Sequence, residues 1–359
     1  MSDQSSPLDE ADLRARVQTI VDEVLTAEGS VLAGVSDDLA PMIETLTDLM
    51  AGGKRMRPAF CYWGWRGAGG DAAQDEAAMR AAASLEFLQA CALIHDDVMD
   101  GSDTRRGLPA VHRRFAGLHR ASAWLGSPEG FGVGAAILLG DLCLSWADQV
   151  LLTAGFPDDA QSRGKAVYDL MRTELMAGQY LDLLEQARGG GSVERALTVV
   201  RFKSAKYTIE RPLHLGAALA GADASVLSAY SGYGLPLGEA FQLRDDILGV
   251  FGDPQETGKP AGDDLREGKR TVLIAVAVER STPKQAAVIR RHLGDPGLGT
   301  EGVEALRSII SETGARDHTE HLISELLDSA LCALDSADID PTARDVLTGL
   351  AHAATKRSV

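Results

Sequence analysis

The segment DEAAMRAAASLEFLQACALIHDDVMD, residues Asp75–Asp100, contains no glycine and no proline. Apolar residues recur along it at spacings of three and four, the period of a helix that buries one face. Similar patterns cover several further stretches: Asp9–Ala27, Ala135–Leu152, Val167–Gln186, Ser225–Val250, Thr271–Val278, His318–Leu334 and Pro341–Ala354. The alternating pattern of a strand is scarce. We therefore predict an all-α fold, with a single helical domain over residues 11–359 and a flexible segment over residues 1–10.

The composition is acidic and excludes some classes of protein. The 359 residues carry 35 Lys and Arg against 52 Asp and Glu, a formal net charge of −17. Such a surface repels nucleic-acid phosphates, so we expect no nucleic-acid partner. No uninterrupted apolar run approaches the ~20 residues that a membrane span needs. The polar start is unlike a signal peptide, and the cysteines include no CxxC pair. These features predict a cytoplasmic protein without a membrane span.

Two pairs of adjacent aspartates lie on apolar helical segments. Asp96 and Asp97 are followed by Asp100, and Asp245 and Asp246 form the second pair. Asp96 and Asp100 share one helix face, where like charges repel each other. Oxygen ligands without His or Cys suit Mg²⁺. The alternative, a solvated helix end, accounts for one such pair better than for two.

Cations cluster close to these pairs. The chain has 8 lysines against 27 arginines, and five of the lysines lie in short segments near glycine or proline: Lys54, Lys203, Lys206, Lys259 and Lys269. Such side chains bind phosphate oxygens, although ordinary surface ion pairing is the alternative. No P-loop, dinucleotide fingerprint or nucleophile elbow is present. Carboxylates, cations and apolar helices together predict a ligand with a diphosphate head and an apolar tail.

Five segments carry a family resemblance: GGKRMRP (52–58), LIHDDVMDGSDTRRGLPAVH (93–112), GQYLDL (178–183), FQLRDDILGVFGD (241–253) and TGKPAGDDLREGKRT (257–271). In order and spacing they closely resemble the trans-isoprenyl diphosphate synthases, or polyprenyl synthetases, from about residue 40 onward. The resemblance implies a helical bundle around a deep central cavity, the isoprenoid synthase type, and a homodimer. It also implies Mg²⁺-dependent condensation of isopentenyl diphosphate with dimethylallyl, geranyl or farnesyl diphosphate.

The resemblance also implies roles for single residues. Asp96, Asp97, Asp100, Asp245 and Asp246 would bind Mg²⁺, three ions per active site, and would form the catalytic set with Lys203 and Gln242. The allylic diphosphate would contact Arg105, Lys203, Gln242, Lys259 and Lys269. Isopentenyl diphosphate would contact Lys54, Arg57, Gln89 and Arg106. No histidine is assigned as a base, because in the family the released diphosphate takes the proton.

The chain departs from the family pattern at two places. The third aspartate of the second motif is replaced by Gly249, and Asp253 cannot be assumed to substitute for it. The usual Lys-Thr pair reads Lys203-Ser204, which keeps a hydroxyl, and Lys206 gives a rival register for this motif. We expect activity to survive both changes.

In this family, the bulk of the residues just before the first motif sets product length. Here those residues, Cys91 and Ala92, are small. Phe87 and Leu88 lie about 12 Å from the motif by helix rise, which leaves room for a longer tail. The sequence therefore predicts geranylgeranyl diphosphate, with farnesyl and longer polyprenyl products as alternatives.

Two remoter functions share the fold. A class I terpene cyclase carries a different second metal motif, usually with Asn, and this chain contains no Asn. A non-catalytic partner subunit has usually lost aspartates, and both pairs are intact here. Both alternatives are therefore weaker than a synthase.

Overall fold

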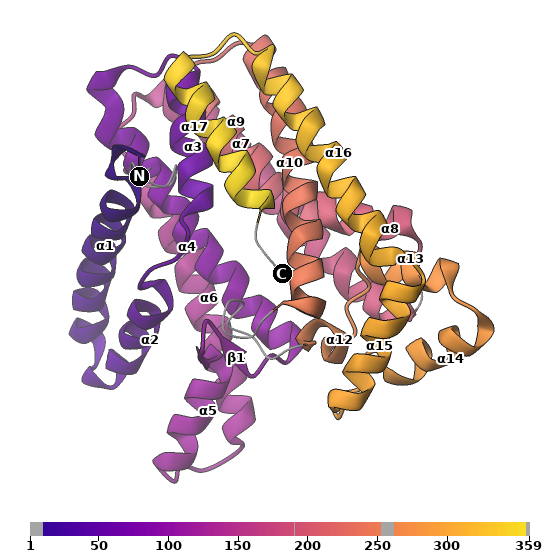
Figure 1. The fold of residues 1–359 in the computed structure, drawn as a ribbon. Helices are drawn as coiled ribbons and strands as arrows, with labels where there is room; N and C mark the ends of the chain where they lie inside the picture. Colours follow the sequence, from indigo (N-terminus) through magenta and orange to yellow (C-terminus); the bar gives the residue numbers. More distant parts are fainter. Residues whose placement is uncertain (1–9, 190, 253–261, 357–359) are drawn as a thin grey trace, which may run out of the picture. The chain divides into compact units, whose positions relative to one another are not determined.

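The computed structural model of the chain describes residues 10–189, 191–252 and 262–356. These residues divide into two compact units, each described by itself below (Figure 1). Unit 1 comprises residues up to Lys165 together with Leu215–Gly221, and unit 2 comprises Ala166–His214 and Ala222 onward. The single domain inferred from the sequence stays a prediction, and the flexible start over residues 1–9 lies outside the described residues.

Unit 1 is helical apart from one small hairpin. Its elements are the 3-10 helices η1 (Glu10–Asp12), η2 (Asp37–Leu39) and η3 (Ala72–Gln74), helices α1 (Leu13–Val35), α2 (Ala40–Met50), α3 (Met56–Gly67), α4 (Asp75–Asp100), α5 (Val111–Ala121) and α6 (Pro128–Leu152), and the antiparallel strands β1 (Thr104–Arg105) and β2 (Leu108–Pro109). The first residues of α7 and the last of α9 complete it.

Helix α4 forms the centre of unit 1 and has the bounds predicted from the sequence. It packs side by side with α6 and also contacts α3, so that Leu85, Phe87 and Leu88 are almost fully buried (Figure 1). The helix ends because Gly101 adopts a left-handed conformation (φ 68°) and closes the last turn. The aspartates of the first motif therefore lie in the final turns of a buried helix, directly before the hairpin.

Unit 2 holds most of the chain's second half. Its elements are most of α7 (Asp158–Arg188), α8 (Val193–Val199), the π-helix η4 (Val200–Glu210), the start of α9 (Arg211–Ala220), α10 (Ala224–Phe251), α12 (Asp263–Glu267), α13 (Val272–Arg280), α14 (Pro283–His292), α15 (Thr300–Glu312), α16 (Ala315–Asp335) and α17 (Pro341–Thr355). Helices α10 and α16 lie side by side (Figure 1), and the buried faces of α10 and α13 share one apolar cluster.

The π-helix η4 is approached closely by its neighbours on two helices. A Cβ on Gly178 of α7 would lie 2.6 Å from the carbonyl carbon of Phe202, and one on Gly238 of α10 would lie 2.7 Å from the carbonyl oxygen of Ala205. Both distances are too short for a side chain, so only glycine permits this packing. A π-helix of 11 residues is unusual, because most π-helical segments are single turns, and this one carries Lys203.

The structure confirms the all-α prediction and corrects some details. The first long helix begins at Leu13 rather than Asp9, because Ala11 and Asp12 have positive φ values, and it continues to Val35. The π-helix and the two-residue strands were not predicted, since neither has a period that the sequence displays.

The expectation that the chain has no membrane span stays a prediction. Two segments, Ala72–Asp100 and Pro128–Leu152, are long and apolar enough to cross a membrane by length and composition. Their most apolar windows are 72% and 39% buried. A core helix passes the same test, so this is weak evidence for a span, and α4 is such a core helix.

Candidate functional site

The aspartates of the first motif are organised by an arginine of the hairpin. Asp97 is 2% exposed, and the Arg105 guanidinium donates to its carboxylate, with Nε 3.0 Å from Oδ1. Arg105 Nη2 also lies 3.6 Å from Asp96 Oδ2. Pairing with Arg105 offsets the repulsion between neighbouring carboxylates that the sequence implied. Unit 1 thus brings together Asp96, Asp97 and Arg105, as predicted, at the end of α4.

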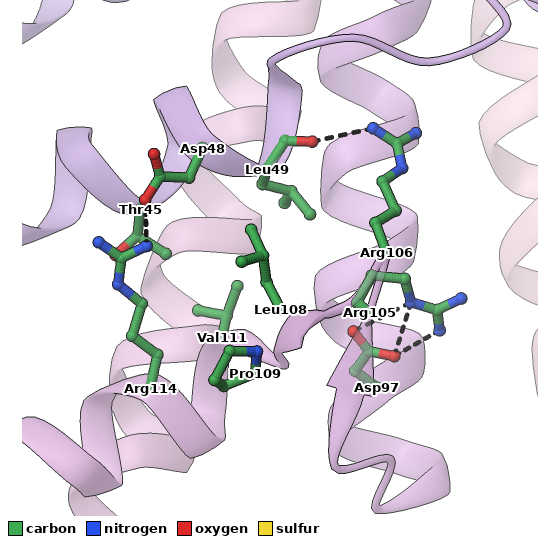
Figure 2. Close-up of a pocket in the computed structure, with 10 residues that line it drawn as sticks. All are labelled: Thr45, Asp48, Leu49, Asp97, Arg105, Arg106, Leu108, Pro109, Val111 and Arg114. Carbon is green, nitrogen blue, oxygen red and sulfur yellow. Dashed lines mark hydrogen bonds and ion pairs between the residues drawn. The ribbon is translucent and has the colours of Figure 1, made fainter. Parts of the chain in front are cut away.

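A cavity of about 240 Å³ lies beside this cluster in unit 1 (Figure 2). Arg106 reaches from the hairpin to the end of α2 and the loop after it, where its Nη1 donates to the carbonyl of Leu49 at 2.9 Å and of Gly52 at 3.3 Å. On the other side of the view, Arg114 pairs with Asp48. The Arg106 guanidinium therefore lies against the segment just before Lys54, another predicted isopentenyl diphosphate ligand.

Lys54, in the loop before α3, and Arg57, in the first turn of α3, flank an anchoring residue to which the sequence assigned no role. Arg55, 3% exposed and with a left-handed φ of 53°, forms a buried ion pair with Glu86 of α4. Its Nη2 also donates to the carbonyl of Met50 at 2.7 Å. Lys54 is exposed, whereas Arg57 is only partly exposed. The available signal was weak: Arg55 lies within the GGKRMRP segment, but nothing local to it indicates Glu86.

Residues predicted to limit product length line the buried faces of α4. Cys91 is 5% exposed, and burial raises the pKa of its thiol to about 12. Phe87 is fully buried and meets Trp146 of α6 edge to face, with ring centroids 6.4 Å apart. Trp146 was not singled out from the sequence. The small pair Cys91 and Ala92 is therefore followed, further from the motif, by the aromatic pair Phe87 and Trp146.

In unit 2, Lys203 and Lys206 are the two candidates for the lysine of the family's Lys-Thr motif. Both are paired with acidic side chains. Lys203 donates to Asp182 Oδ2 at 2.7 Å, and Lys206 donates to Glu210 Oε2 at 3.0 Å. Asp182 belongs to the GQYLDL segment, to which the sequence assigned no role. The choice of Lys203 over Lys206 stays a prediction.

The second motif also contains one buried aspartate, Asp246, which is 5% exposed. Gln242 donates from Nε2 to Asp246 Oδ1 at 2.8 Å, so unit 2 brings these two predicted residues together. Burial raises the pKa of Asp246 to about 8, the charges of Asp264 and Asp245 add to that shift, and the Gln242 hydrogen bond opposes it. Lys269, another predicted ligand, lies 3.5 Å from Asp264 Oδ1. Lys259 lies outside the described residues.

The chemistry of these carboxylates fits a divalent cation. Asp246 Oδ2 is buried and has no hydrogen-bond partner within the part of the chain that the structure describes. A buried carboxylate oxygen left in that state is costly unless a cation or a proton satisfies it. Among residues 10–189, 191–252 and 262–356, no three His, Cys, Asp or Glu side chains form a ready-made metal-binding group. Mg²⁺ takes few protein ligands and completes its shell with phosphate and water.

Comparison with known proteins gives a consistent result. The family model described as polyprenyl synthetase matches residues 40–311. The chain is 33% identical to a geranylfarnesyl diphosphate synthase of Aeropyrum pernix, over 76% of this chain and 80% of that protein. It is 30% identical to the octaprenyl diphosphate synthase of Escherichia coli, over 93% and 97% of the two chains.

A solved structure is also similar. It is a geranylgeranyl pyrophosphate synthase of Corynebacterium glutamicum, complexed with isoprenyl diphosphate and magnesium. The two chains are 44% identical, and the TM-score is 0.92 over 97% of this chain and 100% of the other.

Proposed function

We propose, from the premise that this chain belongs to the polyprenyl synthetase family and is a trans-prenyl diphosphate synthase, that its main product is geranylgeranyl diphosphate. The observation that carries the product length is on α4. Cys91 and Ala92 are small residues next to the first motif, whereas the bulky Phe87 meets the ring of Trp146 further along the helix. A growing tail would pass the small pair and stop at the aromatic pair.

Mg²⁺ is the proposed cofactor, three ions per active site. Asp96, Asp97 and Asp100 would hold it from α4, and Asp245 and Asp246 from α10. When bound, Mg²⁺ neutralises diphosphate oxygens and so stabilises the leaving group's developing charge. Support comes from the buried and unsatisfied oxygen of Asp246 and from the magnesium in the similar Corynebacterium structure.

The remaining polar residues would bind and orient the two substrates. Arg105, Lys203, Gln242, Lys259 and Lys269 would contact the allylic diphosphate. Lys54, Arg57, Gln89 and Arg106 would hold isopentenyl diphosphate. The allylic carbon–oxygen bond breaks, the isopentenyl double bond forms the new carbon–carbon bond, and the proton passes to the released diphosphate. Fixed cations lower the barrier because they are already oriented toward the oxygens that gain charge.

A cytoplasmic homodimer is the proposed state. Helix α6 supports the dimer, because its apolar window is only 39% buried and Phe131, Ile137 and Leu138 are 40–60% exposed. An apolar helix face of this kind needs a cover, and a second copy would supply it.

One assay tests the reaction and its product. The protein is incubated with Mg²⁺, isopentenyl diphosphate and, separately, dimethylallyl, geranyl or farnesyl diphosphate, and product length is measured by chromatography. We expect a twenty-carbon product, and no product when a chelator removes Mg²⁺. Elongation beyond twenty carbons would instead favour the activities after which the Aeropyrum and Escherichia proteins are named, and no elongation from any primer would refute the synthase.

The small size of Cys91 on α4 makes a separate prediction about product length. Cys91→Phe should shift the main product toward fifteen carbons, because an aromatic ring would occupy the space next to the first motif. Product distribution is measured with the same assay. The control is Cys332→Phe, the same substitution at an exposed cysteine, which should leave the distribution unchanged. If Cys91→Phe and wild type gave the same products, the limit would lie elsewhere.

A further inference from the structure

The π-helix η4 is held against α7 by residues that share one face of α7. Glu174, Gly178 and Asp182 follow one another at spacings of four, so their side chains lie on the same face. Gly178 permits close approach, because a Cβ there would collide with the backbone nitrogen of Lys203. The two carboxylates lie one turn to either side of this glycine, and both bind cations. The π-helix is therefore tied to α7 at two places.

Glu174 binds two cations that lie five residues apart. Arg211 forms a fork with its carboxylate, with Nε 2.6 Å from Oε2 and Nη2 2.8 Å from Oε1. Lys206 Nζ lies 3.4 Å from the same Oε1. Burial raises the pKa of Glu174, but the hydrogen bond and charge of Arg211 outweigh burial, so that the pKa lies below its usual value. The charged carboxylate thus joins both cations, an arrangement called the Glu174 bridge.

The same two cations are the ends of the last π-turn. The backbone N–H of Arg211 donates to the carbonyl of Lys206, five residues earlier, which is the hydrogen bond that defines a π-turn. In an α-helix, side chains five residues apart point about 140° apart around the axis. The wider π-turn brings them closer to one face. A single carboxylate that binds both side chains therefore favours the π-turn over the α-turn.

A second acid also binds Lys206. Glu210 Oε2 accepts from Lys206 Nζ at 3.0 Å, and Glu210 Oε1 accepts from the Ser231 hydroxyl at 2.8 Å. Arg211 Nη1 lies 3.0 Å from His214 Nδ1. Because a guanidinium only donates, this ring nitrogen accepts and carries no proton. Glu210 and His214 are 4% and 7% exposed. Lys206 therefore belongs to a buried ion network, which favours a structural role for it.

The direction of Lys203 depends on this geometry. Lys203 lies on the same π-helix and donates to Asp182 Oδ2 at 2.7 Å. A return of this segment to α-helical turns would rotate Lys203 relative to Arg211, because the two helix types have different angles per residue. We propose that Glu174 is a positioning residue for the reaction. By binding Lys206 and Arg211 together, it keeps the π-geometry that directs Lys203 toward the allylic diphosphate. The contact of Lys203 with that diphosphate rests on the proposed function.

Hydrogen–deuterium exchange tests the Glu174 bridge without turnover. Glu174→Gln keeps the shape of the side chain but removes its charge, and should speed exchange of the backbone amides of residues 200–211 by about 10-fold. The matched control is Asp169→Asn, the same change on α7 at a carboxylate that is 47% exposed and pairs with Arg172. It should leave exchange in that segment unchanged. Equal exchange in the two variants would overturn the proposal.

Steady-state kinetics test the positioning itself. Glu174→Gln should raise the KM for farnesyl diphosphate by about 10-fold, because a displaced Lys203 binds the allylic diphosphate less well. The KM for isopentenyl diphosphate should stay within about 2-fold of wild type. An unchanged KM for farnesyl diphosphate, or equal rises in both KM values, would overturn the proposal, since general damage affects both substrates.

Two further outcomes are kept apart. If Glu174→Gln does not fold, Lys206→Met decides through the exchange measurement, because it removes the other half of the Glu174 bridge. Unchanged exchange of residues 200–211 in that variant would overturn the proposal, and faster exchange would support it. Failure of wild type to elongate any primer would count against the proposed function, and the exchange measurement would still decide whether the Glu174 bridge holds the π-helix.

Discussion

Replacing Asp96 with alanine should reduce turnover by about 10²–10³-fold or more while the protein stays folded. The carboxylate is 20% exposed at the end of α4 and lies 3.6 Å from Arg105. If Asp96 binds Mg²⁺ as proposed, its loss removes a ligand whose contribution is largest when the diphosphate departs. The same change leaves the Arg105–Asp97 contact intact, so the local structure should persist.

The rate is measured with labelled isopentenyl diphosphate and a saturating allylic primer, at several Mg²⁺ concentrations. Extra Mg²⁺ should recover only part of the loss, since a missing ligand weakens binding and also misplaces the ion. Asp103→Ala is the matched control, because that carboxylate is 80% exposed and pairs with Arg113. Near-normal turnover of Asp96→Ala would refute its role as a metal ligand.

The largest expected effect on stability comes from Arg55. Arg55→Met should lower the free energy of unfolding by about 3–5 kcal/mol, because Glu86 would be left as an unpaired buried charge. The methionine keeps the apolar stem but none of the donors to Glu86, Gln18 and Met50. Thermal and denaturant unfolding measure the loss, and KM for isopentenyl diphosphate should rise, because Lys54 and Arg57 flank the lost anchor.

Two control variants separate charge from packing. Arg80→Met removes an exposed arginine whose pair with Glu23 spans 3.1 Å, and should change stability by less than about 1 kcal/mol. Arg55→Met with Glu86→Leu removes both buried charges and should recover much of the stability. A single Arg55→Met variant as stable as wild type would show that the ion pair contributes nothing.

The helical period of residues 75–100 was sufficient to predict α4 to its end residues, because a long helix without breakers depends on contacts within a few positions. The motifs were equally local, and their order and spacing led to the family that the comparisons confirm. The roles of single site residues remain predictions. Lys259 falls outside the described residues.

The parts that could not be predicted join distant positions. Arg55 and Glu86 are 31 residues apart, and Lys203 and Asp182 are 21 apart, with no periodic signal connecting them. The π-helix depends on glycines of two other helices that permit close backbone approach. A burial penalty such as that on Asp246 arises only when several elements exclude water together.

Gly249 shows where this division falls. In the sequence, Gly249 stands where the second motif usually has its third aspartate. The nearest acidic residue downstream, Asp253, cannot be assumed to replace that aspartate. Composition, helices, motifs and family follow from the order of residues, because each depends on neighbours within a turn or on a contiguous pattern. The partner that fills the space over Gly249 is decided by folding alone, since only packing brings α12 against α10 and turns Asp264 toward it.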